Sequence, residues 1–362
     1  MDIFTIYLVM VFLVSLVFGA FAQSSQFCPV GGLRETLNKA GSHRLWSYLA
    51  AIAVALIGVN LIEFFGLVNI NDVKPNFRSE EFAYGRYILG GFIFGFGMVL
   101  AAGCGMRNLV RVGQGSLKAL LVVVIMAITA YLMVKTPLYA DVFMPLVAPF
   151  SMQFSTAGTQ DLAGLLVTDN IGSIRLFIAI LLAFFILYFA LKNEGFRQSR
   201  YWLGSLVIGL AITAGFYITG AETGQTLMEE SEFMDAPPLG LAVQSFSFAA
   251  PMADTVYALM NMEGLAVLTF GVVAVIGLPL GALLASLVRR EFKLERGFSN
   301  NKDTVLSLVG AVLVGVGSVL AMGCSVGHGL TGISTLALGS FLALLSIAVG
   351  AYTGLKAERL LK

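Results

Sequence analysis

The sequence predicts an all-α polytopic membrane protein, and its composition and patterning give three reasons for that fold class. Of its 362 residues, 58% are apolar and 12% are charged, whereas a soluble domain has about 25% charged residues. Its 40 glycines and 9 prolines suit closely packed transmembrane helices better than a linker-rich soluble chain. Nine stretches are apolar and long enough to cross a bilayer. The lipid bilayer is therefore the expected surrounding, and the net charge of +1 argues against nucleic acid as a partner.

The predicted spans each hold about 20 mostly apolar residues, the length that a helix needs to cross the hydrocarbon core. They cover residues 3–22, 46–68, 85–102, 116–134, 173–192, 200–220, 264–288, 304–322 and 338–356. The first could be mistaken for a signal peptide, because Ala20-Phe21-Ala22 mimics a cleavage site. No basic residue precedes it and its apolar run is as long as a full span, so we expect an uncleaved first helix.

The segments between spans are moderately polar and rich in Gly, Ser, Thr and Pro. Irregular backbone at membrane depth is tolerated only where protein buries it or where it lines a cavity. Several of these segments are therefore expected to form short or re-entrant helices that dip into the protein. They are residues 23–45, 103–115, 141–170, 236–262 and 323–335.

Lysine and arginine are distributed unevenly between the two sides of the predicted bundle. One side receives 17 of the 22 basic residues. They are Arg34, Lys39, Arg44, Arg107, Arg111, Lys118, Lys192, Arg197, Arg200, Arg289, Arg290, Lys293, Arg296, Lys302, Lys356, Arg359 and Lys362. The other side receives Lys74, Arg78, Arg86, Lys135 and Arg175. Because cytoplasmic loops carry the excess of basic residues, we expect the N-terminus outside and the C-terminus in the cytoplasm.

The chain contains an internal repeat. Residues 90–104 and 310–324 share eight of fifteen residues at a constant offset of 220, and both end in Gly-Cys. A weaker echo relates the segment from Gln23 to Cys28 to the segment from Gln244 to Ala249. The predicted first half is therefore 1–135 and the second 199–362, joined by 136–198 with one middle helix. A single intervening span turns the second half upside down, and such inverted repeats in transporters place their sites near the midplane.

The two Gly-Cys motifs are the strongest candidates for a functional site. In Gly103-Cys104-Gly105 and Gly323-Cys324-Ser325, glycine before the cysteine permits close approach and positive φ. A short helix following from about Met106 or Val326 would point its N–H groups at an anion, and the thiol adds a soft, weak donor. A sulfur anion suits such a site better than sulfate. One lone cysteine is more often simply buried, but two at equivalent positions and a third in a related element favour a function.

Three further residues complete the candidate set. Cys28 precedes Pro29, which suits a first helical turn, so its thiol would lie beside a helix N-terminus. Gln23 would link helices or face the path, and His328 would be either a donor in the path or a packed histidine. The nearby Arg107 and Arg111 could attract the anion at a cytoplasmic mouth, but the positive-inside rule explains them fully.

The cysteine spacing and the two histidines argue against a metal site, a haem or another cofactor. No nucleotide-binding motif is present, which excludes ATP hydrolysis in this chain. We therefore expect a transporter rather than an enzyme, with channel-like passage and proton coupling both open.

At these residues the sequence resembles the YeeE/YedE family of membrane proteins over essentially the whole chain. The shared features are two glycine-rich spans that end in Gly-Cys, the earlier Phe27-Cys28-Pro29 element and the duplicated layout. Characterised members take up thiosulfate, so the resemblance implies an hourglass-shaped inverted repeat in a bacterial cytoplasmic (inner) membrane that carries thiosulfate inward. It implies that Cys28, Cys104 and Cys324 pass the ion along by S–H···S contacts. It further implies a cytoplasmic TusA-like sulfurtransferase as partner.

Alternatives to thiosulfate uptake come from within this family and from other classes. Some relatives are linked to selenium or other sulfur species, so the substrate stays open within that class. A membrane thiol oxidoreductase would need paired cysteines on one side of the membrane, whereas these three are dispersed. A scaffold without transport would give the duplicated Gly-Cys motifs no purpose.

Overall fold

The computed structural model describes residues 2–153, 160–166, 170–234, 237–261, 264–295, 297 and 301–361. Within them are nine helical stretches long and apolar enough to cross a membrane, which confirms the all-α polytopic fold class. Their main helices are α1 (Ile3–Ser24), α3 (His43–Phe64), α4 (Tyr84–Leu100), α6 (Leu117–Lys135), α8 (Ile171–Lys192), α9 (Ser199–Gly220), α12 (Phe270–Val288), α13 (Asn301–Leu320) and α14 (Leu338–Leu361).

Shorter elements fill the segments between these helices, as the sequence predicts. The short α-helices are α2 (Pro29–Leu37), α5 (Gly105–Gly113), α7 (Met144–Val147), α10 (Glu222–Ser231) and α11 (Ala250–Met260). One-turn elements are η1 (Ile70–Asp72), η2 (Tyr139–Phe143), η3 (Leu265–Val267) and η4 (Gly327–Gly332), of which η2 and η4 are π-helical. The described strands are β1 (Glu81–Phe82) and β2 (Met152–Gln153), paired antiparallel.

Three predicted span boundaries differ from the structure by four or more residues. The ninth span continues to Leu361 rather than ending at residue 356. The seventh span begins at Phe270 rather than at residue 264, because the Thr269 hydroxyl caps the helix by accepting a hydrogen bond from the Val272 amide at 3.2 Å. The second ends at Phe64 rather than at residue 68, where Gly66 adopts a φ of +68°. Arg296, Lys362 and parts of the segments 141–170 and 236–262 lie outside the described residues.

The helices pair across the chain in a pattern that mirrors itself. Helix α1 packs on α12 as α9 packs on α3, and α4 packs on α14 as α13 packs on α6. Helices α4 and α13 also pack on each other, as do α1 and α9. Exchanging the first half of the chain for the second reproduces this pattern. The division at residues 135 and 199 stays a prediction.

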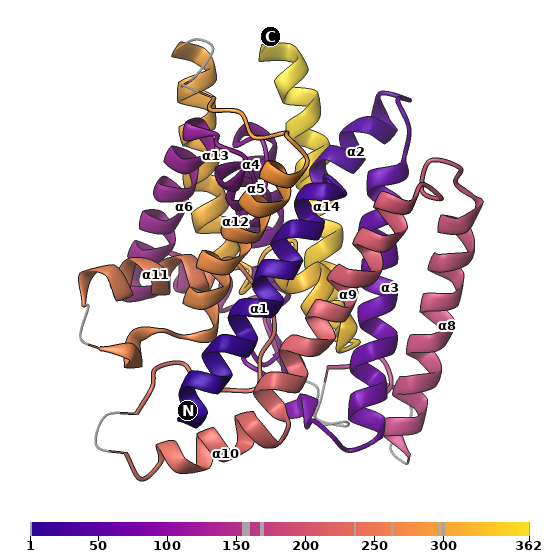
Figure 1. Ribbon diagram of the computed structural model, residues 1–362, viewed down its shortest axis with the longest axis vertical. Coiled ribbons are helices and arrows are strands. Elements are labelled where there is room, and N and C mark those ends of the chain that lie inside the picture. Colours follow the sequence, from indigo (N-terminus) through magenta and orange to yellow (C-terminus); the bar gives the residue numbers. More distant parts are fainter. Residues whose placement is uncertain are drawn as a thin grey trace.

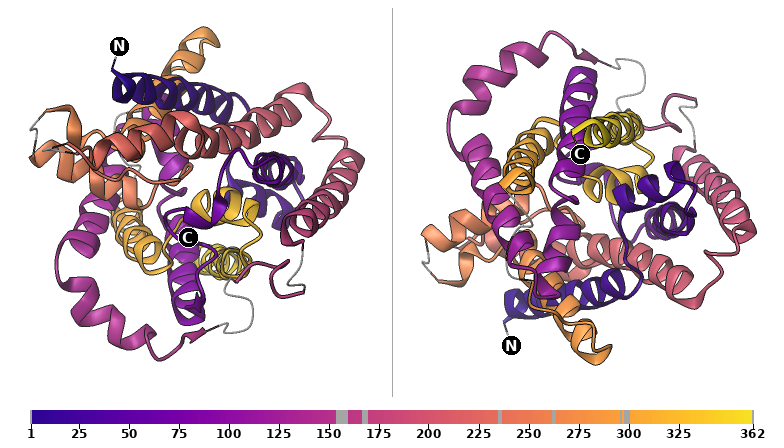
Figure 2. Two further views of the ribbon diagram at one scale, coloured as in Figure 1. Left: turned by 90° about the horizontal axis from the view of Figure 1, so that it is seen from below. Right: turned by 90° about the horizontal axis from the view of Figure 1, so that it is seen from above.

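The two chain ends lie at opposite ends of the bundle, which we call the N-face and the C-face (Figure 1). Helices α2 and α5 lie toward the C-face, and α10 lies at the N-face (Figure 1). Seen end-on, α8 lies on the periphery (Figure 2), where it packs against α3. The middle helix therefore adds lipid-facing surface, and the centre is built from the other elements.

Repeat glycines bring the two Gly-Cys segments together. A Cβ built on Gly90 would lie 2.3 Å from the Ala321 amide nitrogen, and one on Gly310 would lie 2.4 Å from that of Ala101. Both are too close for any side chain. The backbones of α4 and α13 therefore touch, and each helix starts beside the end of the other. Because of this contact, the loops that precede Cys104 and Cys324 lie beside the point where α4 and α13 cross.

A buried cluster of charged side chains holds the segment that follows η4. Glu63 accepts from Arg78 at 2.8 Å and from Arg175 at 2.9 Å, and Arg175 also donates to Asp161 at 2.9 and 3.0 Å. The Arg78 Nε atom donates to the Thr335 carbonyl at 2.8 Å. The segment behind Cys324 is thus tied through Arg78 to α3, to α8 and to the loop that holds Asp161, and Glu63 is a paired residue.

Candidate functional site

Each of the three cysteines follows the same kind of helix ending. The residue two positions before the cysteine has a left-handed backbone, and the next amide bonds to a carbonyl five residues earlier, which is the Schellman motif. The left-handed residues are Gln26, Ala102 and Met322, with φ values of 50°, 56° and 63°. The bonds run from Phe27 to Ala22, from Gly103 to Met98 and from Gly323 to Ser318, at 2.9, 2.8 and 2.9 Å.

Each cysteine then starts the next helical element. The carbonyls of Cys28, Cys104 and Cys324 accept from the amides four residues later, at 3.0, 3.0 and 2.8 Å. The Cys28 sulfur accepts from the Gly31 amide at 3.2 Å, and the Cys324 sulfur accepts from the Gly327 amide at 3.4 Å. The three thiols therefore lie at helix starts, where free N–H groups favour an anion. The predicted helix N-terminus after Cys28 is confirmed, with Pro29 in its first turn.

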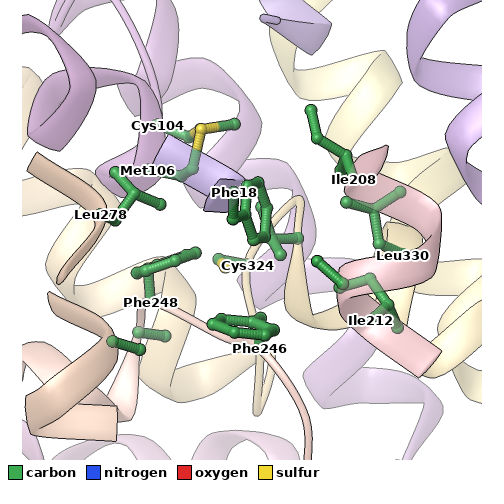
Figure 3. Close-up of a cluster of buried hydrophobic side chains, with 14 of the residues drawn as sticks. Phe18, Cys104, Met106, Ile208, Ile212, Phe246, Phe248, Leu278, Cys324 and Leu330 are labelled. Carbon is green, nitrogen blue, oxygen red and sulfur yellow. The ribbon is translucent and has the colours of Figure 1, made fainter. Parts of the chain in front are cut away.

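The three cysteines are free and buried. Cys104 has both Cys28 and Cys324 among its electrostatic neighbours, together with the Ser325 side chain. Cys104 is therefore close to both of the other thiols. Cys104 and Cys324 lie in one cluster with Phe18, Phe246 and Phe248 (Figure 3). An ion that passes them must leave its water, because these rings are almost fully buried.

A cavity of about 350 Å³ leads toward this cluster from the loops of the N-face. Its lining includes Lys74 on the loop after α3, Ala249 at the start of α11, and Ser247. The Ser247 hydroxyl lies 3.9 Å from the Cys324 sulfur. Ser247 therefore lies between the cavity and the Cys324 thiol. The repeat position Ala249, which has no thiol, lines the cavity and also belongs to the buried cluster.

The predicted glycines have different roles. Gly103 has a φ of +152°, whereas Gly323 does not have a positive φ, although the residue before each is left-handed. A Cβ on Gly323 would lie 2.8 Å from the His328 ring, and one on Gly105 would lie 2.8 Å from the Met252 methyl group. The sequence argument for positive φ therefore holds for Gly103, and at Gly323 the requirement is space.

Ser325 follows Cys324 in the chain and lies close to the Cys104 thiol. It is fully buried, its hydroxyl oxygen has no hydrogen bond of normal geometry within the described part of the chain, and the Cys104 thiol is close enough to act on it. Its carbonyl accepts from the Tyr48 hydroxyl at 2.6 Å. A buried hydroxyl without a firm partner remains available to a passing ligand.

Gln23 and His328 are both engaged elsewhere. The Gln23 amide donates to Glu291 at 2.7 Å and so ties the end of α1 to the segment after α12. The two ring nitrogens of His328 lie 2.7 Å from the Ala321 carbonyl and 3.2 Å from the Ser340 hydroxyl. In the first half, Asn108 reaches the matching carbonyl of Ala101 at 3.4 Å. His328 and Asn108 thus each hold the loop that precedes the cysteine of their own half, and we call these two residues the loop clamps.

Arg107 belongs to the site, although the sequence argument assigned it to the positive-inside rule. It follows Cys104 by three residues in the first turn of α5, and both Cys104 and Cys28 act on its charge. The signal that could have identified it is its spacing from Cys104. A residue three positions after a helix N-cap lies in the first turn, beside the cap side chain.

Comparison with known proteins identifies the family. The sequence model described as "Sulphur transport" matches residues 24–353, nearly the whole chain. The chain belongs to this family. The resemblance to the YeeE/YedE family is thereby confirmed, and so is the expectation of a transport protein rather than an enzyme.

Two curated relatives of the sulphur transport family are similar to this chain over almost their whole lengths. The thiosulfate transporter TsuA of Spirochaeta thermophila is 28% identical over 348 residues, which cover 94% of this chain and 96% of the relative. The thiosulfate transporter TsuA of Escherichia coli is 23% identical over 355 residues, which cover 92% of this chain and 90% of the relative.

Proposed function

We propose that this member of the sulphur transport family carries thiosulfate across the membrane past Cys324, Cys104 and Cys28 in that order. The observation that carries the proposal is the repeated construction around the three thiols. Each lies at a helix start, in the buried centre of a membrane protein, on three separate segments. A purely structural cysteine would not need this arrangement three times.

The chemistry of the group suits the two unlike ends of thiosulfate. A thiol is a weaker hydrogen-bond donor than an amide or a hydroxyl, so it compensates poorly for the lost hydration of a sulfate oxygen. The terminal sulfur of thiosulfate is larger, softer and less hydrated, and its exchange of water for thiols costs less. Two or three such contacts, each on the order of 1 kcal/mol, would favour thiosulfate over sulfate by a few kcal/mol in total.

The proposed direction is inward, with the N-face outside a bacterial cytoplasmic membrane. The uneven distribution of basic residues supports this orientation, and the cavity that reaches Ser247 opens among the loops of the N-face. An ion would enter there, pass the aromatic rings and leave beside Arg107. A small cytoplasmic sulfurtransferase of the TusA type could receive it, as the family resemblance implies.

A second candidate is the transport of another sulfur or selenium anion by the same route. A selenium-containing analogue has an equally soft terminal atom, so the thiols would accept it for the same reason. A thiol oxidoreductase is the weaker alternative, since the three cysteines are free and each occupies its own helix start.

Growth of a sulfate-uptake-deficient bacterial host on thiosulfate as sole sulfur source tests this proposal. We expect rescue by the wild-type chain and loss of rescue by Cys104→Ala at equal membrane expression. Failure of the wild-type chain to support growth, with good expression, would favour the other anions or the oxidoreductase. Uptake into vesicles with and without an imposed proton gradient would then separate channel-like passage from proton coupling.

A further inference from the structure

The guanidinium of Arg107 is partly buried beside two thiols and has no carboxylate partner among the described residues. Its Nη1 atom is shielded from solvent and makes no hydrogen bond within the described part of the chain. The groups that act on its charge are Cys28, Cys104, Arg44 and Arg111. Two of these are cations and two are thiols, so none of them is a fixed counter-ion.

The neighbouring arginines are paired. Arg111, one turn further along α5, lies 3.6 Å from Glu295, and Arg44 lies 3.1 Å from Glu35. Removing a charge from water without a counter-ion is costly. Arg107 therefore has the electrostatic environment of a cation that an incoming anion completes.

The surrounding backbone makes room for Arg107 in this position. A Cβ built on Gly103 would lie 2.9 Å from the Arg107 Cγ atom and 3.0 Å from its Cβ atom, so the stem of Arg107 lies over the glycine. The residue occupies the first turn of the nine-residue helix α5, whose free N–H groups add positive potential. Gly103 thus helps to place a cation next to Cys104.

We infer that Arg107 binds the sulfonate oxygens of thiosulfate while Cys28 and Cys104 contact its terminal sulfur, so that Arg107 is a substrate-binding residue of transport. This inference rests on the proposed function. A guanidinium presents two parallel N–H donors that match two oxygens of an oxyanion, whereas the thiols match the soft sulfur. The inner end of the path would therefore recognise both ends of one ion and fix its orientation.

The test uses the full-length protein in two assays. Thermal unfolding in detergent is measured with and without sodium thiosulfate, and uptake of labelled thiosulfate into proteoliposomes gives KM and kcat. The variant is Arg107→Gln, and the matched control is Arg111→Gln, which removes the same charge from the same helix. Arg107→Lys keeps the charge and removes the paired donors.

Arg107→Gln should raise KM by at least about tenfold, the factor expected for a lost hydrogen bond to a charged group. It should also abolish the thiosulfate-induced rise in Tm without lowering the Tm of the ligand-free protein, because it removes an unpaired charge. Arg111→Gln should keep the ligand-induced rise, and Arg107→Lys should give an intermediate KM. A purely structural Arg107 would instead lower the ligand-free Tm on substitution and leave the ligand-induced rise intact.

The inference about Arg107 and the proposed transport of thiosulfate can be refuted separately. Wild-type KM together with a wild-type ligand-induced rise in Tm for Arg107→Gln would overturn this inference and leave the proposed function standing. Absence of thiosulfate uptake and of any ligand-induced rise in the wild-type protein would overturn the proposed function itself. If Arg107→Gln does not fold, the KM of Arg107→Lys decides, and a wild-type value would refute the paired contact.

Discussion

Cys104 and Cys324 hold equivalent positions in two related elements, but the residues that follow them differ in kind. Cys104 is followed by the α-helix α5, and Cys324 by the π-helical η4, all of whose residues are buried. At the constant offset of 220, Arg107 in the first element corresponds to Gly327 in the second. One thiol therefore has a cation beside it, and the other has a bare backbone N–H.

This difference gives the proposed path a direction. An anion that arrives through the cavity would first meet neutral donors, namely Ser247, Cys324 and the Gly327 amide. It would then reach Cys104 and Cys28 beside the unpaired Arg107. A symmetric repeat thus carries an asymmetric site, and the asymmetry lies in single residues rather than in the fold.

The largest effect expected from this comparison is steric. A Cβ on Gly329 in η4 would lie 1.6 Å from the Tyr48 hydroxyl, which holds the Ser325 carbonyl. On Gly105 in α5 it would meet the flexible end of Met252 at 2.8 Å and the Phe248 carbonyl oxygen at an ordinary contact distance of 3.4 Å. Gly329→Ala should therefore destabilise the protein by about 1–3 kcal/mol or more and lower its Tm well below that of Gly105→Ala. Similar Tm values for the two variants would show that η4 is not packed more tightly than α5.

A smaller effect is expected from the loop clamps His328 and Asn108. His328→Ala leaves the Ala321 carbonyl without its partner, which should cost about 1–3 kcal/mol, whereas His328→Asn should recover part of this by copying the first half. Both variants should keep the wild-type KM for thiosulfate once folded. Thermal unfolding and proteoliposome uptake measure the two quantities. A stable His328→Asn protein with a strongly raised KM would place His328 on the ion path instead.

The smallest effect on transport is expected at Ala249, the repeat position without a thiol. It lines the cavity, so Ala249→Cys should leave thiosulfate uptake nearly unchanged. In a background with Ala at positions 28, 104 and 324, the new thiol should react with an impermeant reagent added outside intact cells. Reaction only in inside-out vesicles would reverse the proposed orientation, and a large loss of uptake would place Ala249 within the narrow path.

The sequence was sufficient for the spans and the thiols because each depends on local chemistry. Apolar length marks the helices, and the Gly-Cys repeats mark the two breaks, so Cys28, Cys104 and Cys324 could all be proposed without a structure. The role of Arg107 could not be, since an arginine near a cytoplasmic end is expected in any membrane protein. Its spacing from Cys104 marks its place in the first turn of α5, but only the structure shows that it has no carboxylate partner among the described residues. Arg111, in contrast, pairs with Glu295, which lies 184 positions further along the chain. The hydrogen bonds of the His328 ring and the bond from Gln23 to Glu291 also depend on the tertiary structure, so they could not be predicted from the sequence.

The most direct measurement of the central claim is the initial rate of labelled thiosulfate uptake into proteoliposomes by Cys104→Ala. Cys104 is close to both of the other thiols, and loss of its sulfur is a small change in volume that should leave the Tm of the ligand-free protein intact. We predict a rate at least about fivefold below wild type, the factor that a contact of about 1 kcal/mol supplies. A wild-type rate from correctly folded Cys104→Ala would contradict the thiol path.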